Sequence, residues 1–87
     1  MYQVFFTPIA VKDIEKLKAV HLDEKAKGLI ELIKKAPYQK PPTYEKLFGD
    51  LQGLYSRRIN IKHRLVYEVY EEEKIIKIVS LWSHNER

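Results

Sequence analysis

The chain contains no cysteine among its 87 residues, and this restricts how so small a protein can be held together. Disulfides, thiolate zinc sites and thiol nucleophiles are excluded, because each of them needs a cysteine side chain. The fold must therefore bury a core of aliphatic and aromatic side chains, and hydrophobic residues make up 45% of the chain. Because domains usually contain about 100–150 residues, we expect residues 1–87 to form a single domain.

The charge of the chain is mildly basic, with 16 Lys and Arg against 12 Asp and Glu and a net charge of +4. Such an excess is compatible with an anionic partner but does not require one. No apolar run reaches the roughly 18–20 residues of a membrane helix. Residues 1–7 also lack the basic start and the apolar stretch of a signal peptide. We therefore expect a cytoplasmic protein that has no contact with a membrane.

The N-terminal third predicts a strand followed by a helical hairpin. Residues 1–7 are rich in aromatic and β-branched side chains, which favours a strand. Thr7 and Pro8 predict a helix start, with Thr7 as the N-cap and Pro8 in the first helical position. A second helix is expected to begin with Asp23 as its cap and to end before Pro37. The apolar stripes are Ala10, Ile14 and Leu17 in the first helix and Ala26, Leu29, Ile30 and Ile33 in the second. The polar side of the first helix is expected to hold Lys12, Asp13, Lys16 and Lys18.

Residues 37–50 change character, with three prolines between positions 37 and 42 and a Gly-Asp pair at the end. Regular structure cannot run far through such a segment, so we expect a surface loop. Long irregular loops in small domains are often functional. Glu45 in this loop is therefore a candidate general base, and the alternative interpretation is an ordinary surface acid.

The C-terminal half is predicted to form three strands, over residues 54–61, 64–70 and 74–82. The second alternates apolar and polar side chains, and the third is apolar on both faces, which is typical of a strand covered on both sides. The element order strand–helix–helix–strand–strand–strand predicts an α+β fold. We expect a four-stranded antiparallel sheet with the helical hairpin packed on one face.

A basic segment from Ser56 to Arg64 carries four arginine and lysine side chains together with His63 and no acid. Neighbouring residues of a strand point to opposite faces, so Arg57 and Arg58 cannot serve one site together. Arg58 and Arg64 lie on facing arms of the predicted hairpin and can converge on a phosphate, which suits the planar guanidinium group. The alternative is a solvated hairpin edge whose positive charge discourages strand pairing.

His84 follows the last predicted strand and titrates near neutral pH, so it can donate or accept a proton. A frayed terminus is the alternative interpretation. The three histidines are too scattered for a metal-ligand motif, and we expect no metal and no cofactor. A base, cationic groups and an acid are what metal-free RNA cleavage requires. The residues alone do not require that function, and a non-catalytic binding module fits them as well.

Residues 51–69 read LQGLYSRRINIKHRLVYEV, and this run closely resembles the YoeB/Txe family of the RelE superfamily of bacterial toxins. The specific pieces are Leu-x-Gly-Leu-Tyr-Ser-Arg-Arg-Ile and His-Arg-Leu-Val-Tyr at this spacing. The proline-rich loop followed by Glu45 and the histidine near the end of the chain also match the family. Length and element order agree throughout, while residues 1–35 match only in pattern.

The resemblance implies a translation-inhibiting endoribonuclease that cleaves mRNA in the ribosomal A site, without metal, by attack of the 2′-hydroxyl on the adjacent phosphate. In that family pattern Glu45 is the general base, His84 the general acid and Arg64 the group that stabilises charge in the transition state. The residues expected to contact the substrate are Arg58, Arg57, Lys62 and Asn85. The implied partners are mRNA, the ribosome and an acidic antitoxin of the YefM/Phd type, and many relatives form homodimers.

Two positions depart from the family pattern. Asn85 stands where the family commonly has tyrosine, and it can form hydrogen bonds but cannot stack on a base, so an altered rate or codon preference is expected. Lys62 stands where the family often has an acid, which changes how protons are handled. Three alternatives stay open: a non-catalytic module that binds nucleic acid or protein, a toxin of this fold that targets topoisomerase, and a degenerate toxin.

Overall fold

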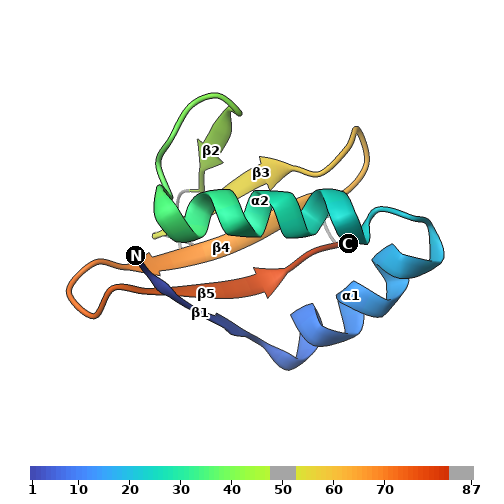
Figure 1. The fold of residues 1–87 in the computed structure, drawn as a ribbon, viewed down its shortest axis with the longest axis horizontal. Coiled ribbons are helices and arrows are strands. Elements are labelled where there is room, and N and C mark those ends of the chain that lie inside the picture. The colour runs from blue at the N-terminus through green and yellow to red at the C-terminus, as the bar shows by residue number, and fades with distance from the viewer. Residues whose placement is uncertain (48–52, 83–87) are drawn as a thin grey trace.

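The computed structural model describes residues 1–47 and 53–82, which form a five-stranded sheet and two helices (Figure 1). The elements are β1 (Gln3–Phe6), α1 (Pro8–Ala19), α2 (Asp23–Lys35), β2 (Tyr44–Lys46), β3 (Leu54–Arg58), β4 (Arg64–Tyr70) and β5 (Ile75–Ser80). Across the sheet the strands follow the order β1-β5-β4-β3-β2. The predicted α+β class is confirmed. No helix within the described ranges is long and apolar enough to cross a membrane.

The sheet differs from the predicted four antiparallel strands in two respects. First, β1 runs parallel to β5, with Gln3 opposite Ile75, so the first and last strands of the described chain lie side by side. Second, the proline-rich segment ends in a strand, β2, which pairs antiparallel to β3. Proline removes a backbone donor only at its own position, and the prolines end at Pro42. Residues 44–46 therefore keep their N–H groups and extend the sheet at its edge.

The turn between β3 and β4 explains why β3 is shorter than the predicted strand over 54–61. β3 ends at Arg58, and the side chain of Asn60 organises the residues that follow. Asn60 Oδ1 accepts hydrogen bonds from the backbone N–H groups of Lys62 at 2.8 Å and His63 at 2.7 Å. This local bonding competes with continued strand pairing, so the chain turns here and enters β4 at Arg64.

The start of α1 is as predicted, and the start of α2 differs by one residue. Thr7 Oγ1 accepts a hydrogen bond from the Ala10 N–H at 3.0 Å and donates one to the Val79 carbonyl at 2.8 Å. Thr7 thus caps the helix and joins it to β5. Asp23 is the first residue of α2 and not its cap, which is Leu22. An acid in the first turn still stabilises the helix, through its interaction with the helix dipole.

The apolar stripes of both helices pack into the core on one face of the sheet, and Figure 1 shows α2 in front of β3 and β4, running roughly along the strands. This burial stabilises the fold by about 1.5–3 kcal/mol for each large aliphatic side chain. The core consists of Ala10, Leu17, Ala26, Ile33, Ile59, Leu65, Tyr67, Ile76, Ile78 and Leu81.

Asp13 does not lie on the polar side of α1, as its position in the sequence suggested. Its side chain is buried with 1% of its surface exposed, and its Oδ2 accepts a hydrogen bond from the Leu81 N–H at 2.9 Å. Leu81 directly follows β5, where the strand ladder has ended. Asp13 therefore satisfies a buried backbone donor at the end of that strand.

Candidate active site

A polar pocket of about 410 Å³ opens where β2, β3 and β4 lie side by side. The strand register places Glu45 opposite Ser56, and Arg58 opposite Arg64. Because side chains alternate along a strand, these four project from the face of the sheet that is opposite to the core. The pocket is lined by Pro42, Thr43, Tyr44, Glu45, Ser56, Arg58 and Arg64.

Arg64 connects the polar groups of the pocket. Its Nη1 lies 3.4 Å from Glu45 Oε1 and donates a hydrogen bond to Ser56 Oγ at 3.1 Å. The side chains of Arg64 and Glu45 are 36% and 65% exposed. Ion pairs at such exposure contribute only about 0–1 kcal/mol. A ligand can therefore separate the carboxylate from the guanidinium group at little cost.

Arg58 adds a second positive charge on the same face. It lies directly opposite Arg64 in the β3–β4 ladder and is exposed. Within residues 1–47 and 53–82, no carboxylate lies within ion-pair distance of Arg58. The pocket therefore carries two guanidinium groups and one carboxylate, and this excess of positive charge suits a phosphate.

Arg57 lies on the opposite side of β3, and its guanidinium group is fully buried. Its Nε donates a hydrogen bond to Tyr67 Oη at 3.1 Å, and its Nη1 donates one to the carbonyl oxygen of Pro42 at 2.6 Å. Its Nη2 donates to the carbonyl oxygens of Pro37 and Gln39, both at 2.9 Å. One buried side chain thus holds the proline-rich segment against the sheet.

The expectation that Arg57 contacts substrate is corrected by this burial, because the guanidinium group is inaccessible and donates four hydrogen bonds to protein oxygens. The prediction that Arg57 and Arg58 face opposite sides of the strand is confirmed. Arg57 serves the pocket indirectly: it fixes residues 37–42, and these residues lead into the strand that carries Glu45. This role could not be predicted from the sequence, since three of the four acceptors are backbone carbonyls in a segment expected to be irregular.

The remaining expected site residues lie elsewhere. Lys62 is exposed in the turn before β4, and its side chain does not line the pocket. His84 and Asn85 lie outside the described residues. Ser56 lies on the same face of β3 as Arg58, and its hydrogen bond to Arg64 was not predicted from the sequence. In the described part of the chain, no three acidic or histidine side chains lie close enough together to hold a metal ion.

His63, the histidine of the basic segment, packs against Trp82. The two rings are stacked, with centroids 4.0 Å apart and an angle of 26° between their planes. Burial lowers the pKa of His63 below its ordinary value, and the positive charge of Lys62 lowers this pKa further. The neutral form of the imidazole is therefore favoured over the charged form.

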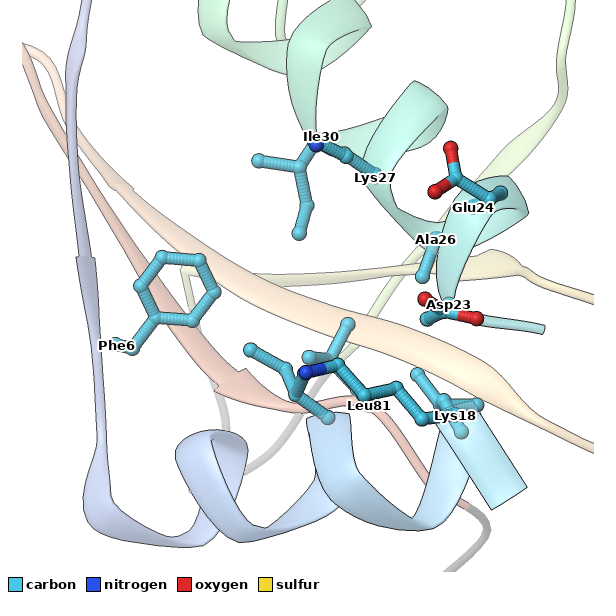
Figure 2. A pocket seen from close by; sticks show the side chains of 10 residues that line it. Phe6, Lys18, Asp23, Glu24, Ala26, Lys27, Ile30 and Leu81 are labelled. Atoms are coloured by element: carbon cyan, nitrogen blue, oxygen red, sulfur yellow. The ribbon is translucent and has the colours of Figure 1, made fainter. Parts of the chain in front are cut away.

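A second hollow, of about 300 Å³, lies between the two helices and the edge of the sheet formed by β1 (Figure 2). Its walls are apolar side chains, with charged groups of α1 and α2 around them. It contains no paired carboxylate and arginine of the kind found in the polar pocket. The lining residues are Phe6, Ile14, Leu17, Lys18, Asp23, Glu24, Ala26, Lys27, Ile30 and Leu81. The polar pocket is therefore the better candidate for chemistry.

Comparison with known proteins gives a consistent result. A family model described as YoeB-like toxin of the bacterial type II toxin–antitoxin system matches residues 6–85. The chain is 36% identical over 64 residues to the toxin YoeB of Synechocystis sp., a match that covers 74% of this chain and 67% of the relative.

Solved structures agree over almost the whole length. A YoeB/ParE toxin from Agrobacterium tumefaciens superposes with a TM-score of 0.85 at 28% identity, covering 94% of this chain and 98% of that one. YoeB in a heterotetrameric YoeB–YefM complex from Staphylococcus aureus superposes with a TM-score of 0.81 at 33% identity, covering 97% and 98%. A YoeB dimer from the same organism covers 95% of this chain and 97% of that one at 34% identity, with a TM-score of 0.80. Because the family model covers the strands of the polar pocket and nearly all of the sequence, the chain belongs to the YoeB-like toxins of bacterial type II toxin–antitoxin systems.

Proposed function

We propose that this toxin is a ribosome-dependent endoribonuclease that cleaves mRNA in the A site, and that the polar pocket binds the scissile phosphate. The observation that carries the proposal is the arrangement of Glu45 and Arg64. The carboxylate of Glu45 on β2 and the guanidinium group of Arg64 on β4 lie 3.4 Å apart across the intervening strand β3, which carries Arg58. Membership of the YoeB-like family supports the same assignment.

The proposed reaction needs no group beyond those of the chain and the RNA. Glu45 accepts the proton of the 2′-hydroxyl, and the 2′-oxygen forms a bond to the phosphorus. Arg64 and Arg58 stabilise the negative charge that gathers on the phosphoryl oxygens. The bond from phosphorus to the 5′-oxygen then breaks, and His84 donates a proton to the leaving oxygen. The products are a 2′,3′-cyclic phosphate and a 5′-hydroxyl end.

Lys62 and Asn85 are proposed to contact the RNA outside the reacting atoms. Lys62 is exposed in the turn that precedes Arg64, so it is suited to a neighbouring phosphate of mRNA or ribosomal RNA. Asn85 follows the proposed acid directly in the chain. An amide there can form hydrogen bonds to a base, but it cannot provide the stacking surface of a tyrosine.

The proposed protein partner is an acidic antitoxin, because the Staphylococcus aureus relative has been solved in complex with YefM. The net charge of +4 suits both such a partner and ribosomal RNA. The relative that was solved as a dimer supports self-association of this chain as well.

Primer extension on a defined mRNA, translated in vitro with and without added toxin, tests the function. Wild-type protein is expected to produce cuts within A-site codons that require ribosomes, whereas Glu45→Gln and His84→Gln are expected to abolish them. Glu31→Gln is the matched control, since it removes an exposed acid from α2, away from the pocket. The cut RNA should carry 5′-hydroxyl ends that a kinase labels without prior phosphatase treatment.

Translation arrest with intact mRNA would contradict the nuclease and identify a binding module. Normal translation with arrested DNA replication would instead identify a toxin of this fold that is directed at topoisomerase.

A further inference from the structure

We infer that His63 is a positioning residue, whose stacking on Trp82 fixes the end of β5 and thereby the place from which the chain continues to His84. The inference rests on the proposed function for its meaning in catalysis. The stacking contact itself is seen in the structure, and neither His63 nor Trp82 lines the polar pocket.

The stack lies just past the end of a strand ladder. The last pair between β4 and β5 is Val66 with Ser80. Beyond that pair the described residues show no further pairing between β4 and β5, and the rings of His63 and Trp82 stack there with centroids 4.0 Å apart. His63 is the residue before Arg64, so this contact joins the backbone next to a proposed catalytic arginine to the end of β5.

His63 is unusual for a packing residue. Its side chain is only 6% exposed, yet its buried Nδ1 has no hydrogen-bond partner among the residues that the structure describes. A buried polar atom without a partner is unfavourable, and leucine or phenylalanine could fill the same space without that cost. The backbone of His63 is fixed as well, because its carbonyl oxygen accepts hydrogen bonds from Ile59 at 2.8 Å and Asn60 at 3.2 Å. The ring is therefore presented to Trp82 from a rigid turn.

The other side of the same segment is held by α1. Asp13 accepts the N–H of Leu81 at 2.9 Å, and the ammonium group of Lys16 lies 5.8 Å from the centre of the Trp82 ring. Leu81 and Trp82 are thus fixed between α1 and the turn before β4. Only Ser83 separates Trp82 from the proposed acid in the sequence, and two residues of extended chain span at most about 7 Å. A fixed Trp82 therefore limits where the proposed acid can lie.

The inference can be measured independently of RNA cleavage, since the chain contains three histidines and one tryptophan. The imidazole NMR signals of His21, His63 and His84 are assigned by single substitution. His63→Ala is expected to shift the His84 signal and to change the Trp82 fluorescence, and to leave the His21 signal in place. An unchanged His84 signal in folded His63→Ala protein would overturn the inference, whether or not the wild type cleaves RNA.

Kinetics provide the second measurement. Small misplacement of a catalytic group costs up to about 100-fold in rate, so His63→Ala is expected to lower kcat by about 10- to 100-fold. KM for programmed ribosomes should stay within about twofold, because no substrate contact is lost. His63→Phe keeps a ring against Trp82 and is expected to restore most of kcat. A raised KM with unchanged kcat would overturn the inference.

Two further variants distinguish a local effect of the His63 ring from unfolding of the protein. His63→Leu fills the space without a ring, so it is expected to fold and to show the same loss of kcat as His63→Ala. His21→Asn is the matched control: His21 is exposed in the turn between the helices at a φ of 62°, which asparagine tolerates. The two proposals can also be separated. If wild-type protein leaves mRNA uncut but the His84 signal still shifts in His63→Ala, the nuclease proposal is rejected and the positioning role of His63 is retained.

Discussion

Arg57 and Arg58 are adjacent in the chain, and their guanidinium groups lie on opposite faces of the sheet. The first is fully buried among backbone carbonyls, and the second lines the polar pocket. The same residue type thus supports the fold at one position and is available to a ligand at the next. Substitutions at the two positions should therefore separate stability from activity.

Arg57→Met is expected to destabilise the protein by about 3 kcal/mol or more, because it leaves several buried acceptors without donors. The acceptors include the carbonyls of Pro37 and Pro42 and the hydroxyl of Tyr67. Urea denaturation followed by circular dichroism measures the loss. Arg58→Met is the matched variant, and as an exposed substitution it should change the free energy of unfolding by no more than about 0.5 kcal/mol. Equal stability of the two variants would contradict the buried role of Arg57.

Glu45→Gln should show the reverse behaviour. Its ion pair with Arg64 is exposed, so the free energy of unfolding is expected to change by at most about 1 kcal/mol. Loss of a general base lowers the rate by about 10²–10⁴-fold. Thermal denaturation measures the predicted small change in stability, and ribosome-dependent cleavage by the same preparation measures the predicted loss of rate. A variant that cleaves at the wild-type rate would remove Glu45 from the mechanism.

The lowered pKa of His63 should make the stability of the protein depend on pH. Its pKa in the folded protein is lowered from 6.5, mainly by burial and secondarily by Lys62. Well above pH 6.5 the imidazole is neutral in both states and contributes nothing to the pH dependence. As the pH falls below that value, the unfolded chain takes up a proton before the folded chain does, so stability falls. The loss is complete once the pH is below the lowered pKa.

The measurement is the Tm of wild type and of His63→Phe at pH 7.5 and at pH 5.5. Wild type is expected to lose more stability than the variant over this interval, since phenylalanine does not titrate. Parallel changes in the two proteins would show that His63 does not supply the difference.

Thr7 gives a prediction for the fold alone. Its hydroxyl group accepts from the Ala10 N–H and donates to the Val79 carbonyl, so Thr7→Val removes a helix cap and a link to β5 while the shape is kept. We expect a loss of about 1–2 kcal/mol. Thr7→Ser retains the hydroxyl and should lose less than half of that amount in the same denaturation experiment.

Local patterns were sufficient to predict much of the secondary structure. The strand over residues 64–70 and the start of α1 at Pro8 follow from alternation and from a capping residue, which act between near neighbours. The convergence of Arg58 and Arg64 follows from a hairpin of short separation. Each of these features depends on contacts that are close in the sequence.

The features that were missed depend on distant partners. Asp13 is buried because it accepts the N–H of Leu81, which is 68 positions away. The parallel pairing of β1 with β5 joins the first strand to the last described strand, and β2 forms because β3 offers an edge for pairing. Nothing in the composition of these segments specifies such partners. Periodicity alone therefore assigned Asp13 to the polar side of its helix, β1 to an antiparallel sheet and residues 44–46 to a loop.

The strand that carries Glu45 is three residues long, lies at the edge of the sheet and is paired on one side. Short edge segments open with free energies well below that of global unfolding. Glu45 can therefore leave Arg64 while the core over β4 and β5 stays intact. Activity should then be lost at a lower temperature or denaturant concentration than the one at which the whole protein unfolds. On mild warming the toxin should become inactive while its core is still folded.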